Sequence, residues 1–242
     1  MRSSTRSSTP SSSDMPRNSV LVSGSFPDSA AAADLLQRRM IEEVARGVGR
    51  IIVEREKRLV SGFGLVVGSA AIAGALSVIL KEDAPNLEKS LLLRPFPREP
   101  PEGITERKFR RRYRDSMVQQ AGICVFVAGL KDERRAGKTK RIVADGVVEE
   151  FESAKRLGRT VIPLGATGGA AANIWKLVNR DLATLCPFIR RKDFDLLNNT
   201  NQSSAELLQA VDRIIEASEK PLSLSMRMSQ WASTFSVDPR RS

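Results

Sequence analysis

Residues 59–75 have the sequence Leu59-Val60-Ser61-Gly62-Phe63-Gly64-Leu65-Val66-Val67-Gly68-Ser69-Ala70-Ala71-Ile72-Ala73-Gly74-Ala75. A short apolar run leads into a turn of glycine and serine, and a run of small residues follows. This order predicts a strand, a tight loop and a helix, an arrangement that binds phosphate because the first N–H groups of a helix lack partners. Gly62 and Gly64 permit a close approach of a ligand to the backbone, and Ser61 and Ser69 add hydroxyl groups that can cap the helix. We therefore expect a nucleotide phosphate to bind at this turn.

This turn matches neither of two common phosphate-binding motifs. Its glycines are spaced G-x-G-x-x-x-G, one residue longer than the dinucleotide fingerprint, and no acidic residue follows at the distance that the fingerprint requires. Gly137-Lys138-Thr139 resembles the end of a Walker loop, but Asp132 stands where that loop has its first glycine. The alternative interpretation is therefore an ordinary turn between a strand and a helix of an α/β sheet.

The composition limits the classes of function. The chain has 242 residues, enough for one α/β domain with tails, and a net charge of +11 from 39 basic and 28 acidic residues. Such a charge suits an anionic partner, from nucleic acid to a small phosphate ligand. An aromatic content of 5% disfavours a platform for stacking bases. The absence of histidine excludes histidine-dependent acid–base catalysis and disfavours zinc.

The cysteines and the apolar segments indicate a cytoplasmic protein. Cys124 lies inside an apolar run and is expected to be buried, and its distance from Cys186 fits no metal-binding motif. The most apolar window, residues 65–80, is interrupted by small residues and too short for a membrane span. The N-terminus does not resemble a signal peptide. We expect no metal, no other cofactor and no membrane association.

The order of the predicted elements gives a single domain at residues 19–219. Residues 1–18 are rich in Ser and Thr and are expected to be a disordered leader or a linker to another domain, and residues 220–242 a flexible tail. The 59–75 stretch supplies one strand and a helix that ends near residue 81. We predict further strands at residues 19–22, 91–93, 123–127 and 160–163, and further helices at residues 29–54, 106–120, 146–157, 171–179 and 204–217.

Strands that alternate with helices predict a Rossmann-like, doubly wound parallel α/β sheet. Glycine-rich turns follow three of the strands, at residues 23–25, 62–64 and 165–169. In open α/β sheets ligands bind at the carboxyl ends of the strands. Three such turns at one edge favour a phosphate ligand more strongly than one turn does.

Two other segments contribute to the expected site. In the helix at residues 106–120, Phe109, Tyr113 and Met117 form a stripe that we expect to be buried, and Arg114 lies beside it. Residues 131–141 form a basic segment that we expect to be mobile, and Asp145 is expected to cap the next helix.

Several short motifs occur in an order that resembles the SLOG superfamily. They are Val22-Ser23-Gly24-Ser25, Val60-Ser61-Gly62-Phe63-Gly64 with Gly68-Ser69, Tyr113-Arg114-x-x-Met117, and Asp145-Gly146-Val147-x-x-Glu150-Phe151. The resemblance covers residues 19–217 and is closest to the ligand-sensing (STALD-type) SLOG domain of Thoeris-like antiphage effectors. A more distant resemblance is to the LONELY GUY phosphoribohydrolases and to the DprA-like proteins.

The resemblance implies a pocket for an ADP-ribose-type nucleotide, in particular a cyclic ADP-ribose isomer made by a partner TIR-domain protein. In this interpretation the glycine turns hold the pyrophosphate, Arg114 pairs with a phosphate and Glu150 faces a ribose. A pocket lysine is also implied, and Lys131, Lys138 and Lys140 are the alternatives. The candidate ligand-binding residues are Ser23, Gly24, Ser25, Gly62, Phe63, Gly64, Gly68, Ser69, Arg114, Gly129, Lys138 and Glu150.

The residues themselves are compatible with these roles. A planar guanidinium such as that of Arg114 binds phosphate through two parallel hydrogen bonds. Glu152 has Arg156 four residues later as an expected surface partner, whereas Glu150 has Ala154 there. The alternative is that Arg114 and Glu150 are ordinary solvated side chains.

Three functions remain to be distinguished. The first is a sensor that binds the nucleotide and controls a homo-oligomer, a separate effector or a TIR-domain protein. The second is a nucleotide N-glycosidase of the LONELY GUY kind, with Arg114 and Glu150 as its catalytic residues. The Pro-Gly-Gly-x-Gly-Thr-x-x-Glu loop of those enzymes is absent, because residues 128–130 and 144–147 are Ala-Gly-Leu and Ala-Asp-Gly-Val. The third, DprA-like binding of nucleic acid, is disfavoured because no aromatic platform accompanies the basic residues.

Overall fold

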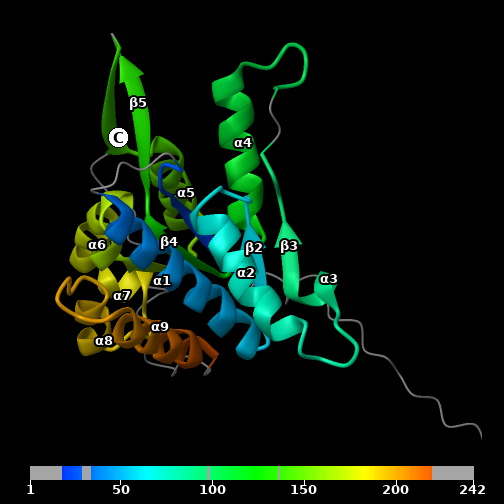
Figure 1. Cartoon of the computed structure of the whole chain (residues 1–242), viewed down its shortest axis with the longest axis vertical. Coiled ribbons are helices and arrows are strands. Elements are labelled where there is room, and N and C mark those ends of the chain that lie inside the picture. Colours follow the sequence, from blue (N-terminus) through cyan, green and yellow to red (C-terminus); the bar gives the residue numbers. More distant parts are fainter. Residues whose placement is uncertain (1–17, 29–33, 97–98, 136, 220–242) are drawn as a thin grey trace, which may run out of the picture.

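The computed structural model describes residues 18–28, 34–96, 99–135 and 137–219. A central sheet of five parallel strands has the order β3 (Leu91–Leu93), β2 (Arg58–Ser61), β1 (Ser19–Ser25), β4 (Ile123–Ala128) and β7 (Thr160–Leu164) (Figure 1). β1 and β4 lie at the centre, paired from Val20 opposite Ile123 to Ser25 opposite Ala128. Every residue of β4 is buried, as its uninterrupted apolar run predicts for a strand covered on both faces.

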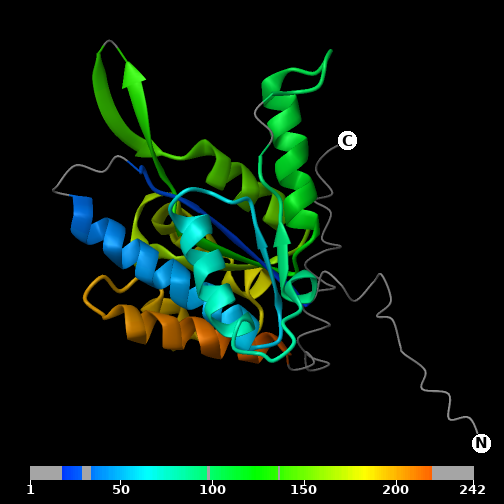
Figure 2. The same cartoon turned by 45° about the vertical axis from the view of Figure 1, so that its right-hand side comes forward.

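Helices cover both faces of this sheet (Figure 2). α1 (Leu35–Glu54) and α2 (Val67–Ile79) lie on one face, and α5 (Asp145–Arg156), with α4 (Glu106–Gln119) packed beside it, lies on the other. α6 (Gly169–Arg180) packs along β4 and β7, and α9 (Ser204–Glu219) packs against α1. The short elements are α3 (Leu87–Ser90), the 3₁₀ turn η2 (Gly165–Thr167), α7 (Leu182–Leu185) and α8 (Arg191–Leu196). This confirms the predicted Rossmann-like, doubly wound architecture.

Glycines allow α1 and α2 to cross at close range. A Cβ atom added to Gly49 of α1 would lie 1.9 Å from the carbonyl oxygen of Ala71 in α2. A Cβ atom on Gly74 of α2 would lie 1.8 Å from the carbonyl oxygen of Arg46 in α1. Each helix therefore requires a glycine where the backbone of the other passes, and this contact fixes α2 and the turn that precedes it against the sheet.

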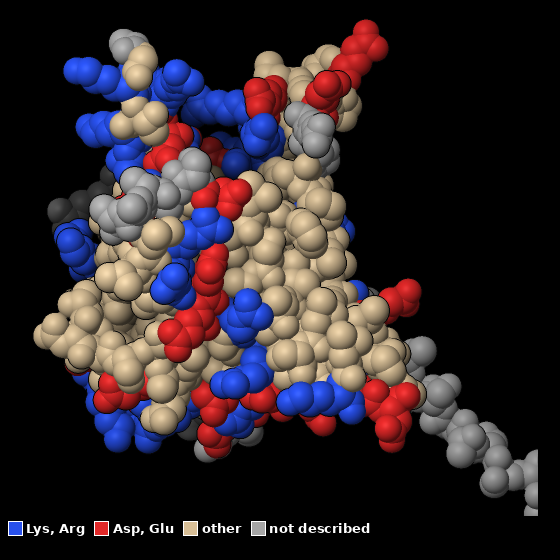
Figure 3. Space-filling view, viewed as in Figure 1, with Lys and Arg blue, Asp and Glu red and all other residues tan. Residues whose placement is uncertain are grey.

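The basic segment at residues 131–141, predicted to be mobile, contains an antiparallel hairpin that was not predicted. β5 (Leu130–Arg135) pairs with β6 (Lys138–Val143), and Gly137 has a φ of 78° at the turn. Polar residues stand on both faces of these strands, so they lack the alternation of apolar and polar residues by which a strand is recognised. Lys and Arg side chains gather on this hairpin (Figure 3).

Arg141 fixes the base of the hairpin to the body of the domain. Its guanidinium lies 3.0 Å from the Asp132 carboxylate across the hairpin and 2.7 Å from that of Asp34, next to the beginning of α1. It also lies over the ring of Phe26, 5.1 Å from the ring centre. The hairpin and the N-terminal half of α4 both extend beyond the edge of the sheet where the strands end (Figures 1 and 2).

The stripe expected to be buried on α4 is only partly so. Met117 is buried, whereas Phe109 and Tyr113 are half-buried. Their partner is the segment after β3, because the Phe96 ring lies 4.8 Å from that of Tyr113 and the Tyr113 hydroxyl donates to the carbonyl of Pro95. The stripe therefore holds this segment over the carboxyl ends of β1 and β2.

The beginnings of two helices were predicted only in part. Of the helix predicted at residues 29–54, residues 29–33 lie outside the described residues; α1 is described from Leu35, and Leu36, whose spacing in the helix predicts burial, is exposed. Asp145 is the first residue of α5 and not its cap, a position that Ala144 holds. The Asp145 carboxylate instead lies 2.6 Å from the Lys131 ammonium.

The leader predicted at residues 1–18 and the tail predicted at residues 220–242 lie outside the described residues, apart from Asn18. Within the described ranges no helix is both long and apolar enough to cross a lipid bilayer. No three Cys, Asp or Glu side chains of these ranges are grouped as they would be around a metal ion.

Candidate functional site

A cavity of about 100 Å³ lies where β1 and β2 end. α2 reaches it from one face of the sheet and α4 and α5 from the other. The residues that line it are Leu21, Val22, Ser23, Gly24, Ser61, Gly62, Gly64, Gly68, Phe96, Met117 and Glu150. Six of the predicted ligand-binding residues are among them: Ser23, Gly24, Gly62, Gly64, Gly68 and Glu150. A pocket of this size is smaller than the roughly 300–1,000 Å³ of typical ligand sites, so it holds only part of a nucleotide as it stands.

The turn between β2 and α2 is held by its own hydroxyl groups. The Ser61 hydroxyl accepts a hydrogen bond of 3.3 Å from the N–H of Phe63, and the Ser69 hydroxyl donates one of 3.3 Å to the carbonyl of Gly64. Neither serine caps α2, since the N-cap is Val66 and has no side-chain bond, so that expectation was wrong. The two hydroxyls shape the loop itself.

Phe63 has an unusual backbone conformation in this turn. Its φ is 61°, a region that bulky residues rarely adopt, and its side chain is exposed at the turn beside the cavity. Strain of this kind accumulates at functional loops. Gly68 is also constrained, because an added Cβ atom would lie 3.1 Å from the Ser61 hydroxyl, whereas one on Gly64 would meet only ordinary contacts.

The end of β1 brings a glycine and a buried hydroxyl to the cavity. A Cβ atom on Gly24 would lie 2.1 Å from the carbonyl oxygen of Val127, so only glycine fits between β1 and β4 here. The Ser23 hydroxyl is buried, lies close to the Glu150 carboxyl group and makes no hydrogen bond of good geometry within the described part of the chain. A buried hydroxyl of this kind that lines a cavity is available to a ligand.

Glu150 places a carboxyl group in the cavity from α5. It is buried, so it is not the solvated side chain of the alternative interpretation. Burial raises the pKa of this carboxyl above its ordinary value, and the nearby Ser23 hydroxyl and Arg114 guanidinium oppose part of the change. Arg156 was predicted to pair with Glu152. That prediction was wrong, because the Arg156 guanidinium lies 2.7 Å from the Asp115 carboxylate instead.

Arg114 lies next to two of the residues that line the cavity, Glu150 and Phe96. Its guanidinium lies 3.8 Å from the Glu150 carboxylate and over the ring of Phe96, 5.2 Å from the ring centre. The nearest anion is the Glu149 carboxylate, at 2.7 Å. Only 16% of the Arg114 side chain is exposed, so it is not an ordinary solvated arginine either. The structure thus brings Arg114 and Glu150 together beside the glycine turn.

The remaining candidates lie farther from the cavity lining. The Ser25 hydroxyl donates to the carbonyl of Leu130, and Gly129, with a φ of 95°, packs against Ala170. Both therefore shape the base of the hairpin. Lys138 is exposed near the tip of the hairpin.

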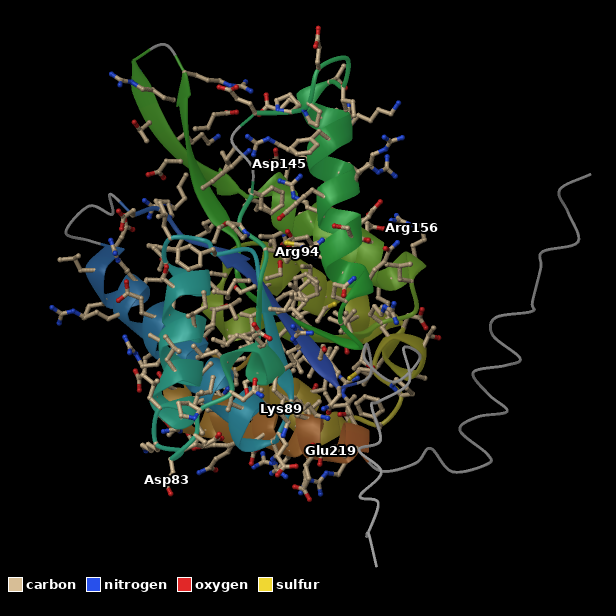
Figure 4. All side chains as sticks on the ribbon, turned by 90° about the vertical axis from the view of Figure 1, so that its right-hand side faces the viewer. Asp83, Lys89, Arg94, Asp145, Arg156 and Glu219 are labelled. Atoms are coloured by element: carbon tan, nitrogen blue, oxygen red, sulfur yellow. The ribbon has the colours of Figure 1, made fainter. Side chains whose placement is uncertain are left out.

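Among the three alternative lysines, Lys131 lies nearest to α5. It pairs with Asp145, and the neighbouring residue Gly146 contacts the Arg114 guanidinium. Asp145 lies toward the end of the molecule where α4 projects and Arg94 near the middle, whereas Lys89 and Glu219 lie toward the opposite end (Figure 4).

The third glycine turn, at residues 165–169, shares the sheet edge but does not line the cavity. β4 separates it from β1, and its Gly165 packs against Asn198 and Trp175. Phe96, Glu149 and the lining role of Met117 were not predicted from the sequence. The aromatic residue in Arg94-Pro95-Phe96-Pro97, directly after a strand, is the signal that could have indicated Phe96.

We predict that Glu150→Gln raises the stability of the free protein at pH 7. Because the pKa of Glu150 is higher in the folded state, the wild-type chain loses stability as the pH rises from the ordinary value of 4.5 through the raised pKa. The glutamine side chain avoids this loss, so the advantage of the variant shrinks as the pH approaches 4.5. Denaturant unfolding at several pH values measures the difference, and a variant less stable by the same amount at every pH contradicts this assignment.

The chain is similar to several known proteins. A family model described as the Sir2- and TIR-associating SLOG family (STALD) matches residues 12–218. The NAD(+) hydrolase ThsA of Bacillus cereus (strain MSX-D12) is 30% identical over 178 residues, which are 72% of this chain and 36% of that protein. The NAD(+) hydrolase ThsA of Cytobacillus dafuensis is 30% identical over 210 residues, 83% of this chain and 40% of that protein.

The chain thus spans about two fifths of the length of these relatives. Among solved structures, the X-ray structure of TM1055 matches 66% of this chain and 81% of its own, with 19% identity and a TM-score of 0.41, too low to add to the fold assignment. The family match extends over nearly all of the described sheet and its helices, and the chain belongs to the Sir2- and TIR-associating SLOG (STALD) family.

Proposed function

We propose that this chain is a nucleotide-sensing module that binds an ADP-ribose-type ligand, in particular a cyclic ADP-ribose isomer, in Thoeris-like antiphage defence. The observation that carries the proposal is the juxtaposition of Arg114 and Glu150, 3.8 Å apart, beside the cavity under the β2–α2 turn. A guanidinium, a carboxyl group and a glycine turn at a helix N-terminus are the groups that bind a phosphate linked to a sugar.

Each group has a distinct role in this proposal. The β2–α2 turn, with Gly62, Gly64 and Gly68, receives the pyrophosphate. Arg114 pairs with a phosphate oxygen. Glu150 and the Ser23 hydroxyl bind ribose hydroxyl groups, and the exposed ring of Phe63 lies beside the base or the second ribose.

Sensing is favoured over cleavage of a glycosidic bond by the surroundings of Glu150. An N-glycosidase requires an ionised carboxylate next to the developing ribosyl cation. Burial raises the pKa of Glu150, which favours its neutral form, and the Arg114 guanidinium lies against it. Both effects weaken the stabilisation of a cation, while neither prevents hydrogen bonding to a ribose.

We propose that the activity controlled by this sensor belongs to another domain or another protein. The ThsA relatives are named as NAD(+) hydrolases, and this chain matches about two fifths of their length. We propose that ligand binding here controls an effector domain or a separate effector or TIR-domain protein, through a change in a homo-oligomer. Such control requires only that the ligand binds one state of the assembly more tightly than another.

A thermal-shift screen tests the proposal. The panel contains NAD, ADP-ribose, its cyclic isomers, AMP and a single-stranded oligonucleotide. A ligand at about 100 times its Kd adds about 2.7 kcal/mol of stability, which raises the Tm of a domain of this size by roughly 5–10 °C. We expect this rise with an ADP-ribose-type nucleotide and unchanged ligand on chromatography afterwards.

Other results point to the alternatives. Turnover of the nucleotide indicates the N-glycosidase. A rise with the oligonucleotide alone, which falls steeply as salt is added, indicates nucleic-acid binding, because each neutralised phosphate releases counterions.

A further inference from the structure

The Arg114 guanidinium, which the proposed function assigns to a ligand phosphate, is already paired with Glu149. We propose that Glu149 is an intramolecular competitor of the ligand: its carboxylate occupies Arg114 in the free protein and must leave before an anionic ligand can bind. The inference rests on the proposed function and adds to it a residue that sets the affinity and the charge requirement of the site.

The geometry of the pair supports a competitor. One Arg114 Nη donates to a Glu149 carboxylate oxygen at 2.7 Å, the distance of a strong charge-assisted hydrogen bond. The same guanidinium is only 3.8 Å from Glu150. A carboxylate and a phosphate present similar oxygens to a guanidinium, so a phosphate oxygen can take the position of Glu149.

Arg114 itself has little freedom to move. The guanidinium lies over the Phe96 ring, 5.2 Å from the ring centre, and close to the backbone of Gly146. A Cβ atom on Gly146 would lie 2.7 Å from the Arg114 Nη2 atom, so the backbone of α5 passes close to this group. The guanidinium therefore stays beside the cavity while its partner changes.

Of the two carboxylates at Arg114, Glu149 is the one that can leave. The Glu149 side chain is 39% exposed, so it can turn into solvent and be hydrated there. The Glu150 side chain is 10% exposed and is enclosed by the cavity, so it has no such route. Two adjacent residues of α5 therefore differ in role, one binding the ligand and the other giving way to it.

The local charges make this exchange necessary. Besides Glu149, Asp145 interacts with the charge of Arg114: the pKa of Asp145 is lowered by its hydrogen bond to Lys131 and also by the charge of Arg114. A phosphate added to this group would meet repulsion from the Glu149 and Asp145 carboxylates. A phosphate that replaces Glu149 leaves the charge next to Arg114 nearly unchanged. Only a ligand with an anionic group can make that replacement, so a neutral nucleoside gains little from Arg114.

Removing the competing charge should therefore tighten binding. We expect Glu149→Gln to bind ADP-ribose about tenfold more tightly than the wild-type chain, because one charge-assisted hydrogen bond no longer has to be broken. Binding of inorganic pyrophosphate, which tests the phosphate contact alone, should tighten in parallel. Isothermal titration calorimetry at constant ionic strength measures both.

Glu152→Gln is the matched control. It makes the same change of charge on the same helix, and its side chain makes no ion pair within the part of the chain that the structure describes. Its affinity for both probes should stay within about twofold of the wild type. In an Arg114→Gln background, Glu149→Gln should lose its effect, since the competition acts only through the guanidinium.

The outcomes separate this inference from the proposed function. Wild-type binding of ADP-ribose with equal or weaker binding by Glu149→Gln overturns the competitor and leaves the sensor intact. Equal gains in Glu149→Gln and Glu152→Gln also overturn it, because they indicate a general effect of charge. If wild type and Glu149→Gln both fail to bind either probe, the competitor and the assignment of this site to an ADP-ribose phosphate fall together.

Discussion

Replacing Arg114 by glutamine is expected to weaken the binding of ADP-ribose by at least about 30-fold. Removing one partner of a hydrogen-bonded charge pair typically costs about 2–5 kcal/mol, and here the lost partner is the cation proposed for the phosphate. Glutamine keeps part of the side-chain volume over Phe96. The substitution therefore removes mainly the positive charge and the bidentate hydrogen-bond donors of the guanidinium. Isothermal titration calorimetry gives the affinities.

Arg110→Gln is the control for this prediction. Arg110 lies one turn earlier on α4 and pairs with Glu106 at the helix surface, so its loss should leave the affinity unchanged. Both variants should keep the circular dichroism spectrum of the wild type. An Arg114→Gln variant that is folded and binds ADP-ribose as tightly as the wild type removes Arg114 from the site.

Replacing Gly49 by alanine is expected to destabilise the fold by about 2–4 kcal/mol. A loss of stability would be informative, because alanine in a helix interior normally stabilises a helix by about 1 kcal/mol relative to glycine. The added Cβ atom would lie 1.9 Å from the carbonyl oxygen of Ala71, and neither backbone can move without shifting a whole helix. The Tm should fall by roughly 5–15 °C in a thermal melt.

Gly47→Ala is the control, because it makes the same change two residues earlier on α1. Its Cβ atom would meet only the side chain of Leu208, which can change its rotamer, so a smaller loss is expected. Equal stabilities of Gly49→Ala and the wild type would show that α1 and α2 are not in the close contact described for them.

The sheet could be predicted because its signals are local. The uninterrupted apolar run at residues 123–127, rich in β-branched residues, is typical of a parallel strand buried on both faces. The glycine turn after β2 was likewise predicted from spacing, and the parallel order of the strands brought it to the end of β1. Short-range pattern and the rules of parallel sheets were sufficient here.

The hairpin could not be predicted because its strands lack such a pattern. Lys131, Glu133 and Arg135 on one face are as polar as Asp132 and Arg134 on the other. Its pairing is held by Arg141, which bonds to Asp132 within the hairpin and to Asp34 outside it. A contact to Asp34 joins residues more than a hundred positions apart, and no local signal reports it.

The site was predicted in part for a similar reason. Val147, Phe151 and Ala154 define the inner face of α5, and Glu150 stands on the same face, so helical periodicity contains the signal for its burial. Glu149 lies at the margin of that face, and its pairing with Arg114 depends on how α4 packs on α5. The position of the Arg114 guanidinium over the Phe96 ring depends on the segment after β3, which has no regular secondary structure that a sequence pattern could predict.

A crystal structure of the chain with ADP-ribose would show whether the cavity beside the β2–α2 turn holds the nucleotide. We expect phosphate oxygens at the turn that contains Gly62 and Gly64, a phosphate within hydrogen-bond distance of Arg114, and a ribose hydroxyl at Glu150. We also expect that the Glu149 carboxylate has turned away from Arg114. A nucleotide bound elsewhere on the chain, with Arg114 still paired to Glu149 and the cavity at β1 and β2 unchanged, would contradict these expectations.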